Sequence, residues 1–202
     1  MKTANQITLA RLGMAFVLPF FLLSDLSFGK TAALVIFGAA ALTDFWDGLI
    51  ARRSGTITLF GRLMDPVADK VLICSAFICF AAQDQIVPAW IVIVIMAREF
   101  MVTGIRLLAA SQGMTVVPGR WGKHKTLWQI VVIIVIILGE AVRDDLLPVI
   151  NSGGGNLEFD LAAFNQYFNP LIFWIVVMVA VLTVISGTIY LWQYRKLVMK
   201  DA

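Results

Sequence analysis

Six apolar segments of about 20 residues divide this sequence, and they constrain the fold more than any other feature. Each is long enough to cross a hydrocarbon core as an α-helix, which satisfies its own backbone hydrogen bonds in lipid. Because 60% of the residues are apolar and only 14% are charged, we predict an all-α membrane protein with six transmembrane helices in one domain over residues 1–202. The segments lie near residues 7–23, 31–53, 62–82, 86–109, 123–141 and 170–193.

Lysine and arginine positions predict the orientation of these helices. If the N-terminus is cytoplasmic, nearly all basic residues in the loops and at the helix ends lie on the cytoplasmic side of the membrane. Only Lys30 and Arg143 lie on the outer side. Both termini are therefore expected in the cytoplasm, with the protein in a bacterial inner membrane and an acidic outer loop at about residues 142–169. The net charge of +3 follows from this bias and gives no reason to expect a nucleic-acid partner. Cys74 and Cys79 are expected to be buried apolar residues.

Four aspartates lie at the predicted cytoplasmic ends of the second and third segments. Asp44 and Asp47 are three residues apart, and Asp65 and Asp69 are four apart, so each pair shares one helix face. Two unit charges 4 Å apart repel by about 4 kcal/mol at an effective dielectric constant of 20. Protonation, pairing with arginine or metal binding would each relieve this repulsion. Two divalent cations would balance four carboxylates, and their oxygen atoms suit Mg²⁺ or Mn²⁺.

The spacing of these aspartates resembles the signature of the CDP-alcohol phosphotransferase family. The resemblance implies that family's fold, frequent homodimers, and a cytoplasm-facing site that transfers a phosphatidyl group from CDP-diacylglycerol, a membrane lipid, to an alcohol with release of CMP. It also implies that the four aspartates bind two metal ions, that Asp69 is the general base, and that Gly48, Ala51, Arg52 and Gly61 contact the nucleotide. The matching pattern is Asp44-x2-Asp47-Gly48-x2-Ala51-Arg52-x8-Gly61-x3-Asp65-x3-Asp69.

A second set of polar residues indicates which alcohol accepts the phosphatidyl group. Arg98 and Arg106 are eight residues apart on the fourth segment, and Lys123, Lys125 and Thr126 open the fifth. Positive charge at a helix N-terminus suits a phosphate group, although the two lysines also fit the positive-inside rule. The stretches at residues 97–106 and 122–126 resemble family members that use glycerol 3-phosphate. Residues 5–11 resemble them as well, which implies that Thr8 and Arg11 lie near the nucleotide.

The sequence leaves two alternatives open. The same chemistry could use another acceptor, namely inositol phosphate, serine or phosphatidylglycerol. A divalent-cation transporter would also collect intramembrane aspartates. Transporters, however, show inverted repeats or broken helices near the membrane midplane, whereas these four acids lie together at one end of two helices.

Overall fold

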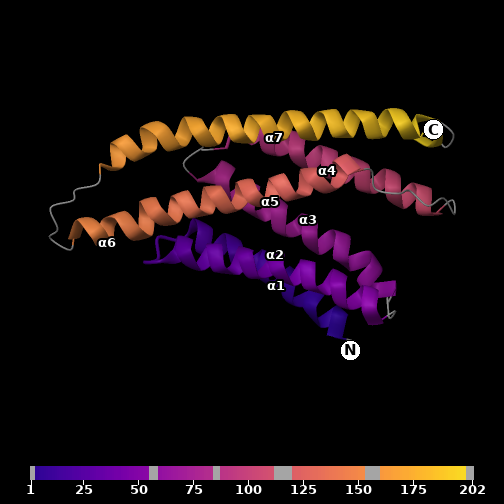
Figure 1. Cartoon of the computed structure of the whole chain (residues 1–202), viewed down its shortest axis with the longest axis horizontal. Helices are drawn as coiled ribbons and strands as arrows, with labels where there is room; N and C mark the ends of the chain where they lie inside the picture. The colour runs from indigo at the N-terminus through magenta and orange to yellow at the C-terminus, as the bar shows by residue number, and fades with distance from the viewer. Residues whose placement is uncertain (1–2, 55–58, 84–86, 112–119, 153–159, 199–202) are drawn as a thin grey trace.

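The computed structural model describes residues 3–54, 59–83, 87–111, 120–152 and 160–198. All regular secondary structure in these residues is helical (Figure 1). Six helices have 21 to 38 residues, and a six-residue π-helix (η1) and a short helix (α6) continue α5. The elements are α1 (Thr3–Leu23), α2 (Gly29–Ser54), α3 (Leu59–Ala82), α4 (Ala89–Ser111), α5 (Arg120–Glu140), η1 (Ala141–Leu146), α6 (Leu147–Ser152) and α7 (Leu161–Val198).

The six long helices coincide with the six predicted segments, but the predicted loop at 142–169 is wrong at both ends. Residues 141–152 continue α5 as η1 and α6, and α7 begins at Leu161. The charged Arg143, Asp144 and Asp145 mark the end of the apolar run rather than the end of the helix. The last predicted segment begins near residue 170. In the structure Pro170 lies in the interior of α7, which begins nine residues earlier at Leu161.

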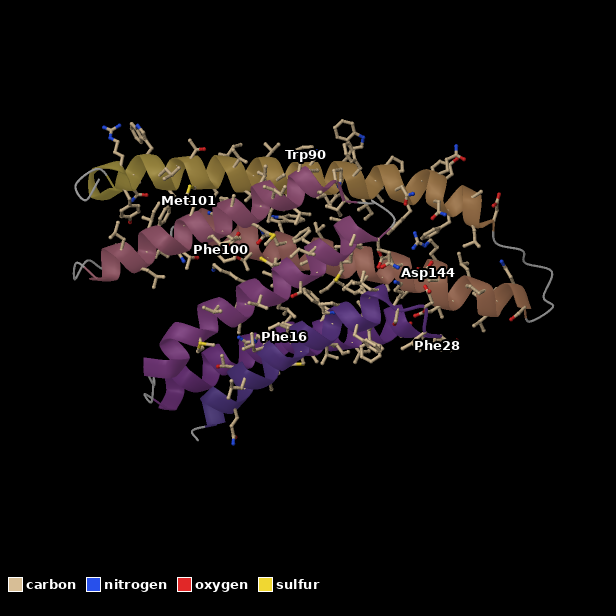
Figure 2. The ribbon with its side chains drawn as sticks, turned by 180° about the vertical axis from the view of Figure 1, so that it is seen from behind. Phe16, Phe28, Trp90, Phe100, Met101 and Asp144 are labelled. Carbon is tan, nitrogen blue, oxygen red and sulfur yellow. The ribbon has the colours of Figure 1, made fainter. Side chains whose placement is uncertain are left out.

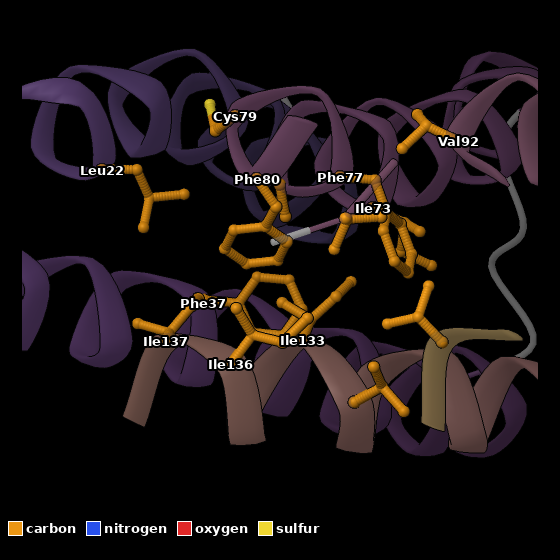
Figure 3. Close-up of a cluster of buried hydrophobic side chains, with 14 of the residues drawn as sticks. Leu22, Phe37, Ile73, Phe77, Cys79, Phe80, Val92, Ile133, Ile136 and Ile137 are labelled. Carbon is orange, nitrogen blue, oxygen red and sulfur yellow. The ribbon is translucent and has the colours of Figure 1, made fainter. Parts of the chain in front are cut away.

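Successive long helices run in opposite directions, so both chain termini lie at the same end of the bundle (Figure 1). Helix α1 packs against α2 and α3, α5 packs against α2 and α7, and α4 packs against α7. A large cluster of buried aliphatic and aromatic side chains lies between these helices (Figure 3). Phe77 and Phe80 of α3 meet edge to face there, with ring centroids 6.3 Å apart. Cys74 and Cys79 are buried and free, as predicted.

The outer surface of the helices is also apolar. Phe16 of α1 is more than half exposed, as are Trp90 and Phe100 of α4 (Figure 2). By length and composition, two stretches of the described residues can cross a membrane, Gln6–Leu23 and Leu161–Arg195. Such an apolar exterior is expected where lipid, and not water, surrounds the helices.

The end of the bundle opposite the termini is closed by polar contacts. The backbone N–H and Oγ1 of Thr31, in the first turn of α2, both donate to Oδ2 of Asp145 in η1, each at 2.7 Å. The carboxylate therefore caps the N-terminus of α2, where negative charge is favourable. Buried Lys30 donates from Nζ to the carbonyl oxygen of Leu22 near the end of α1.

Candidate active site

An ion pair between α1 and α3 contains the predicted general base. The Nη1 atom of Arg11 donates to Oδ1 of Asp69 at 2.8 Å. The arginine side chain is 1% exposed, whereas the aspartate side chain is 38% exposed. Thr8 is also buried and precedes Arg11 by three residues, so both lie on the same face of α1. The buried guanidinium group thus holds a carboxylate that still reaches the surface of the bundle.

Arg11 and Asp69 line a small pocket among α1, α2, α3 and α5. Thr126 of α5, from the predicted acceptor set, contributes to the same pocket. The volume is about 40 Å³, which is room for one or a few water molecules. The pocket therefore lies next to Asp69, but it is too small to hold a whole substrate. Its other lining residues are apolar: Phe37, Ala40, Ala41, Leu72, Ile73 and Ile130.

The side chains of nine predicted site residues lie outside the described part of the structure, although their backbone belongs to α2, α3 and α5. Asp44 follows the pocket residue Ala40 by one helical turn, and Asp65 precedes Asp69 by one turn. The backbone of the acidic motif therefore belongs to two helices that line the pocket. The nine residues are Asp44, Asp47, Gly48, Ala51, Arg52, Gly61, Asp65, Lys123 and Lys125.

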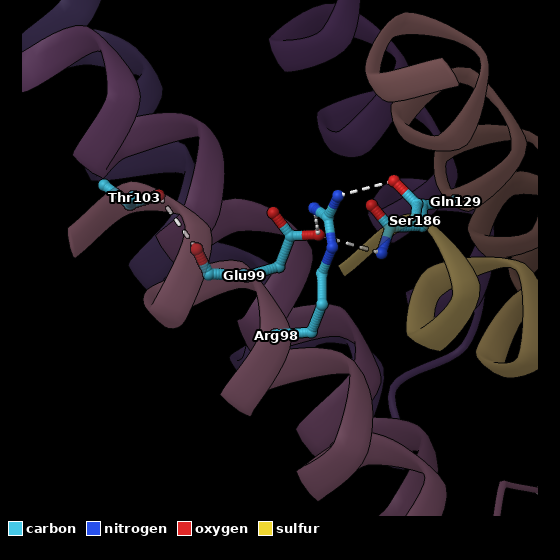
Figure 4. Close-up of polar contacts among 5 residues, drawn as sticks. All are labelled: Arg98, Glu99, Thr103, Gln129 and Ser186. Atoms are coloured by element: carbon cyan, nitrogen blue, oxygen red, sulfur yellow. Dashed lines mark hydrogen bonds and ion pairs between the residues drawn. The ribbon is translucent and has the colours of Figure 1, made fainter. Parts of the chain in front are cut away.

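Arg98 is the centre of a polar network that joins α4, α5 and α7 (Figure 4). Its Nη2 donates to Oγ of Ser186 at 2.8 Å, and its Nη1 lies 3.5 Å from Oε1 of Glu99. The Nε2 of buried Gln129 approaches the same Glu99 oxygen at 3.4 Å. Gln129 follows Thr126 by three residues on α5. One face of α5 therefore connects the pocket beside Asp69 with the network around Arg98.

Arg106 also faces α7. Its Nε donates to the hydroxyl oxygen of Tyr190 at 3.3 Å, and its guanidinium carbon lies 5.6 Å from the centre of that ring. The structure thus brings Arg98 and Arg106 together along the contact between α4 and α7, whereas Thr126 lies beside Asp69. The sequence pattern did not predict Ser186 or Tyr190 as site residues.

Lys70, which no sequence pattern indicated, follows Asp69 directly and lies in a groove between α3 and α4. The groove has a volume of about 450 Å³, and its walls are mainly apolar, with Phe100, Gly104 and Leu107 on the α4 side. Lys70 faces α4 across this groove, opposite Thr103 and Gly104. A further cationic side chain therefore lies one residue from Asp69, on the side of α3 that faces α4.

This arrangement combines two chemical capacities. A carboxylate held by a guanidinium group can accept a proton from a hydroxyl group. Arginine side chains bind phosphate through paired N–H donors. The described residues therefore include a proton acceptor, Asp69, and two guanidinium groups that can bind phosphate, Arg98 and Arg106.

Comparison with known proteins gives a consistent result. The family model described as CDP-alcohol phosphatidyltransferase matches residues 1–185. The chain is 34% identical to the CDP-diacylglycerol–glycerol-3-phosphate 3-phosphatidyltransferase of Bacillus subtilis (strain 168), over 94% of this chain and 91% of that protein. It is 32% identical to the protein of the same name from Rickettsia felis, over 95% of this chain and 94% of that protein.

A further relative has a higher identity over a shorter region. A probable phosphatidylglycerophosphate synthase of Mycobacterium tuberculosis is 41% identical over 67% of this chain and 65% of its own length.

Proposed function

The chain belongs to the CDP-alcohol phosphatidyltransferase family, and we propose that it transfers a phosphatidyl group from CDP-diacylglycerol to glycerol 3-phosphate. The products are phosphatidylglycerophosphate and CMP. The observation that carries this proposal is the similarity, over more than nine tenths of the chain, to relatives named for this reaction. Membership in an enzyme family argues against the cation-transporter alternative.

Asp69 is the proposed general base. The acceptor hydroxyl oxygen forms a bond to the lipid-side phosphorus while the bond from that phosphorus to the CMP oxygen breaks, and the hydroxyl proton passes to the Asp69 carboxylate. The ion pair with Arg11 supports this role because it fixes the position of the carboxylate. Accurate positioning contributes a large part of the rate when two substrates must meet.

Asp44, Asp47, Asp65 and Asp69 would hold two divalent cations, Mg²⁺ or Mn²⁺. This donor set consists only of carboxylate oxygens, which are the ligands these ions prefer. Support also comes from the backbone register, since Asp44 and Asp65 are each one turn from a pocket residue. When bound, the ions would neutralise charge on the diphosphate. Thr8, Gly48, Ala51, Arg52 and Gly61 are the proposed nucleotide contacts.

The acceptor's phosphate is proposed to bind to Arg98 and Arg106, with Lys123, Lys125 and Thr126 completing the site. A phosphate-bearing acceptor needs fixed positive charge that serine does not. The proximity of Thr126 to Asp69 supports this assignment, because the hydroxyl that reacts and the phosphate that is recognised belong to one small molecule.

We also propose that α1 to α5 and α7 span a bacterial inner membrane with both termini and the active site on the cytoplasmic side. The family and the two apolar helices indicate a membrane protein. Each of these helices has at least 21 residues, enough to cross the hydrocarbon core. The common end of the two termini supports placing both on the same side of the membrane. A homodimer remains a prediction from the family resemblance.

The test of the proposed function is CMP release from CDP-diacylglycerol by the purified protein, with each acceptor supplied in turn. We expect release with glycerol 3-phosphate to exceed release with serine by at least about a hundredfold, because serine has no phosphate to fill the cationic site. EDTA should abolish release, and added Mg²⁺ or Mn²⁺ should restore it. Preference for inositol phosphate or phosphatidylglycerol would contradict the acceptor assignment, and turnover in EDTA would contradict the metal assignment.

Replacing Arg106 by alanine tests the acceptor site. We expect the KM for glycerol 3-phosphate to rise by about 10- to 100-fold, the effect of losing hydrogen bonds from a charged donor. The KM for CDP-diacylglycerol should change little. Arg195→Ala is a matched control, because this exposed arginine also stacks on an aromatic ring of α7, Trp192, at 4.9 Å. An unchanged KM in Arg106→Ala would contradict the proposed phosphate contact.

A further inference from the structure

Helix α7 presents a narrow face of small and polar residues to α4. Its members follow the spacing i, i+3, i+4 and i+7, which is one face of a helix. All are buried or half-buried, in a helix whose other faces carry exposed apolar side chains. We call this set the α7 polar face; it consists of Thr183, Ser186, Gly187 and Tyr190.

The α7 polar face contacts both arginines of the proposed acceptor site. Ser186 accepts a hydrogen bond from Arg98, and Tyr190 accepts one from Arg106 and lies beneath its guanidinium group. Gly187 makes room for the arginine stem: a Cβ atom added there would come within 2.7 Å of Cγ of Arg98. The contact therefore depends on the absence of a side chain at 187 as well as on the two hydroxyl groups.

These contacts leave donors available on each arginine. Among the described residues, Nε of Arg98 is buried without a hydrogen-bond partner. Arg106 uses Nε for Tyr190, and no described residue is hydrogen-bonded to its two terminal nitrogens. Those two nitrogens form the edge of the guanidinium group that binds phosphate in a bidentate manner. A buried donor without a partner is costly, and an anionic ligand would satisfy it.

We propose that Ser186 and Tyr190 are positioning residues that hold Arg98 and Arg106 in the orientation required by the phosphate of the acceptor. This inference rests on the proposed function, because it assigns the arginines to the acceptor. A flexible arginine loses side-chain entropy when it binds a ligand. Hydroxyl groups that fix the guanidinium beforehand reduce that loss. Helix α7 thus contributes to acceptor affinity without contacting the acceptor.

The experiment measures steady-state kinetics of Ser186→Ala and Tyr190→Phe in the full-length protein. We expect each variant to raise the KM for glycerol 3-phosphate by about three- to tenfold, the effect of one hydrogen bond. The kcat and the KM for CDP-diacylglycerol should stay within about twofold of the unsubstituted protein. Tyr190→Phe keeps the ring under Arg106, so the packing of α4 on α7 is preserved.

Thr183→Val is the matched control. Thr183 lies on the same polar face and is fully buried, but its hydroxyl has no hydrogen-bond partner among the described residues. Valine keeps the shape of the side chain, so this variant should leave both KM values unchanged. A purely structural role for the polar face would instead lower kcat and raise both KM values together in Ser186→Ala and Tyr190→Phe. That result, or an unchanged KM for glycerol 3-phosphate, would overturn the inference.

Arg98→Gln and Arg106→Gln separate failure of this inference from failure of the proposed function. If both raise the KM for glycerol 3-phosphate but the two α7 variants do not, only the positioning role is wrong. If neither arginine variant changes that KM, the acceptor assignment is wrong and the positioning role is wrong with it.

Discussion

Asp69→Asn should reduce turnover by about a thousandfold, within the range expected when a general base is removed. The amide has nearly the same size and can still accept a hydrogen bond from Arg11, so the contact between α1 and α3 should persist. It cannot take a proton from the acceptor hydroxyl. Binding of CDP-diacylglycerol should be largely retained, and CMP release together with a lipid-binding assay would measure both quantities.

Asp25→Asn provides the control for that experiment. Asp25 is exposed in the short connection between α1 and α2, 14 residues after Arg11 and beyond the last turn of α1. The same chemical change there should leave turnover unaffected. Near-normal turnover in Asp69→Asn would show that the base is another residue, whereas loss of lipid binding in that variant would show that its metal-binding role, and not proton transfer alone, accounts for the lost turnover.

Arg11→Gln should lower both stability and turnover. The substitution leaves Asp69 without the guanidinium group that holds it. Because the Asp69 side chain is 38% exposed, water screens the remaining charge, and we expect the free energy of unfolding to fall by about 1–3 kcal/mol, less than for a fully buried pair. Turnover should fall by about 10- to 100-fold because a displaced base reacts slowly. Thermal unfolding in detergent and CMP release would measure the two effects.

Two further variants test the cause of this effect. Arg11→Lys keeps the charge but loses the planar donor group, so its turnover should lie between those of the parent and Arg11→Gln. Arg143→Gln removes an arginine whose ion pair, with Nε 2.6 Å from Oδ1, joins it to its sequence neighbour Asp144. Because that pair lies within η1, loss of the pair itself should cost less than about 1 kcal/mol. An equal effect of Arg143→Gln and Arg11→Gln would contradict the special role of the Arg11 contact.

The sequence predicted the helices well because each apolar run is bounded by turn residues or charge. The prediction of a loop from polar side chains was wrong at residues 142–152 and 161–169, which are helical. In the structure, Asp145 is buried and binds the start of α2. Its partner is 114 residues away in the chain, and local patterns do not contain such a contact. Charge alone therefore did not distinguish a helix end from a helix that continues beyond the apolar core.

The candidate site was predictable in part. The aspartate motif was visible from spacing, and Arg98 and Arg106 were visible as cations within an apolar helix. Their contacts with α7 were not, since a serine or tyrosine in an apolar helix can also face lipid headgroups or a neighbouring helix. The signal that could have revealed them is the spacing of Thr183, Ser186, Gly187 and Tyr190, which repeats on one helix face.

The pocket beside Asp69 draws on α1, α2, α3 and α5, which has a consequence for biosynthesis. The ribosome delivers Arg11 first and Thr126 much later, so the pocket cannot close until α5 has been synthesised. The contacts of α7 with both arginines form later still, near the end of translation. A nascent chain halted between these stages would have the pocket beside Asp69 but not the α7 contacts with Arg98 and Arg106, so we expect it to bind the second substrate weakly.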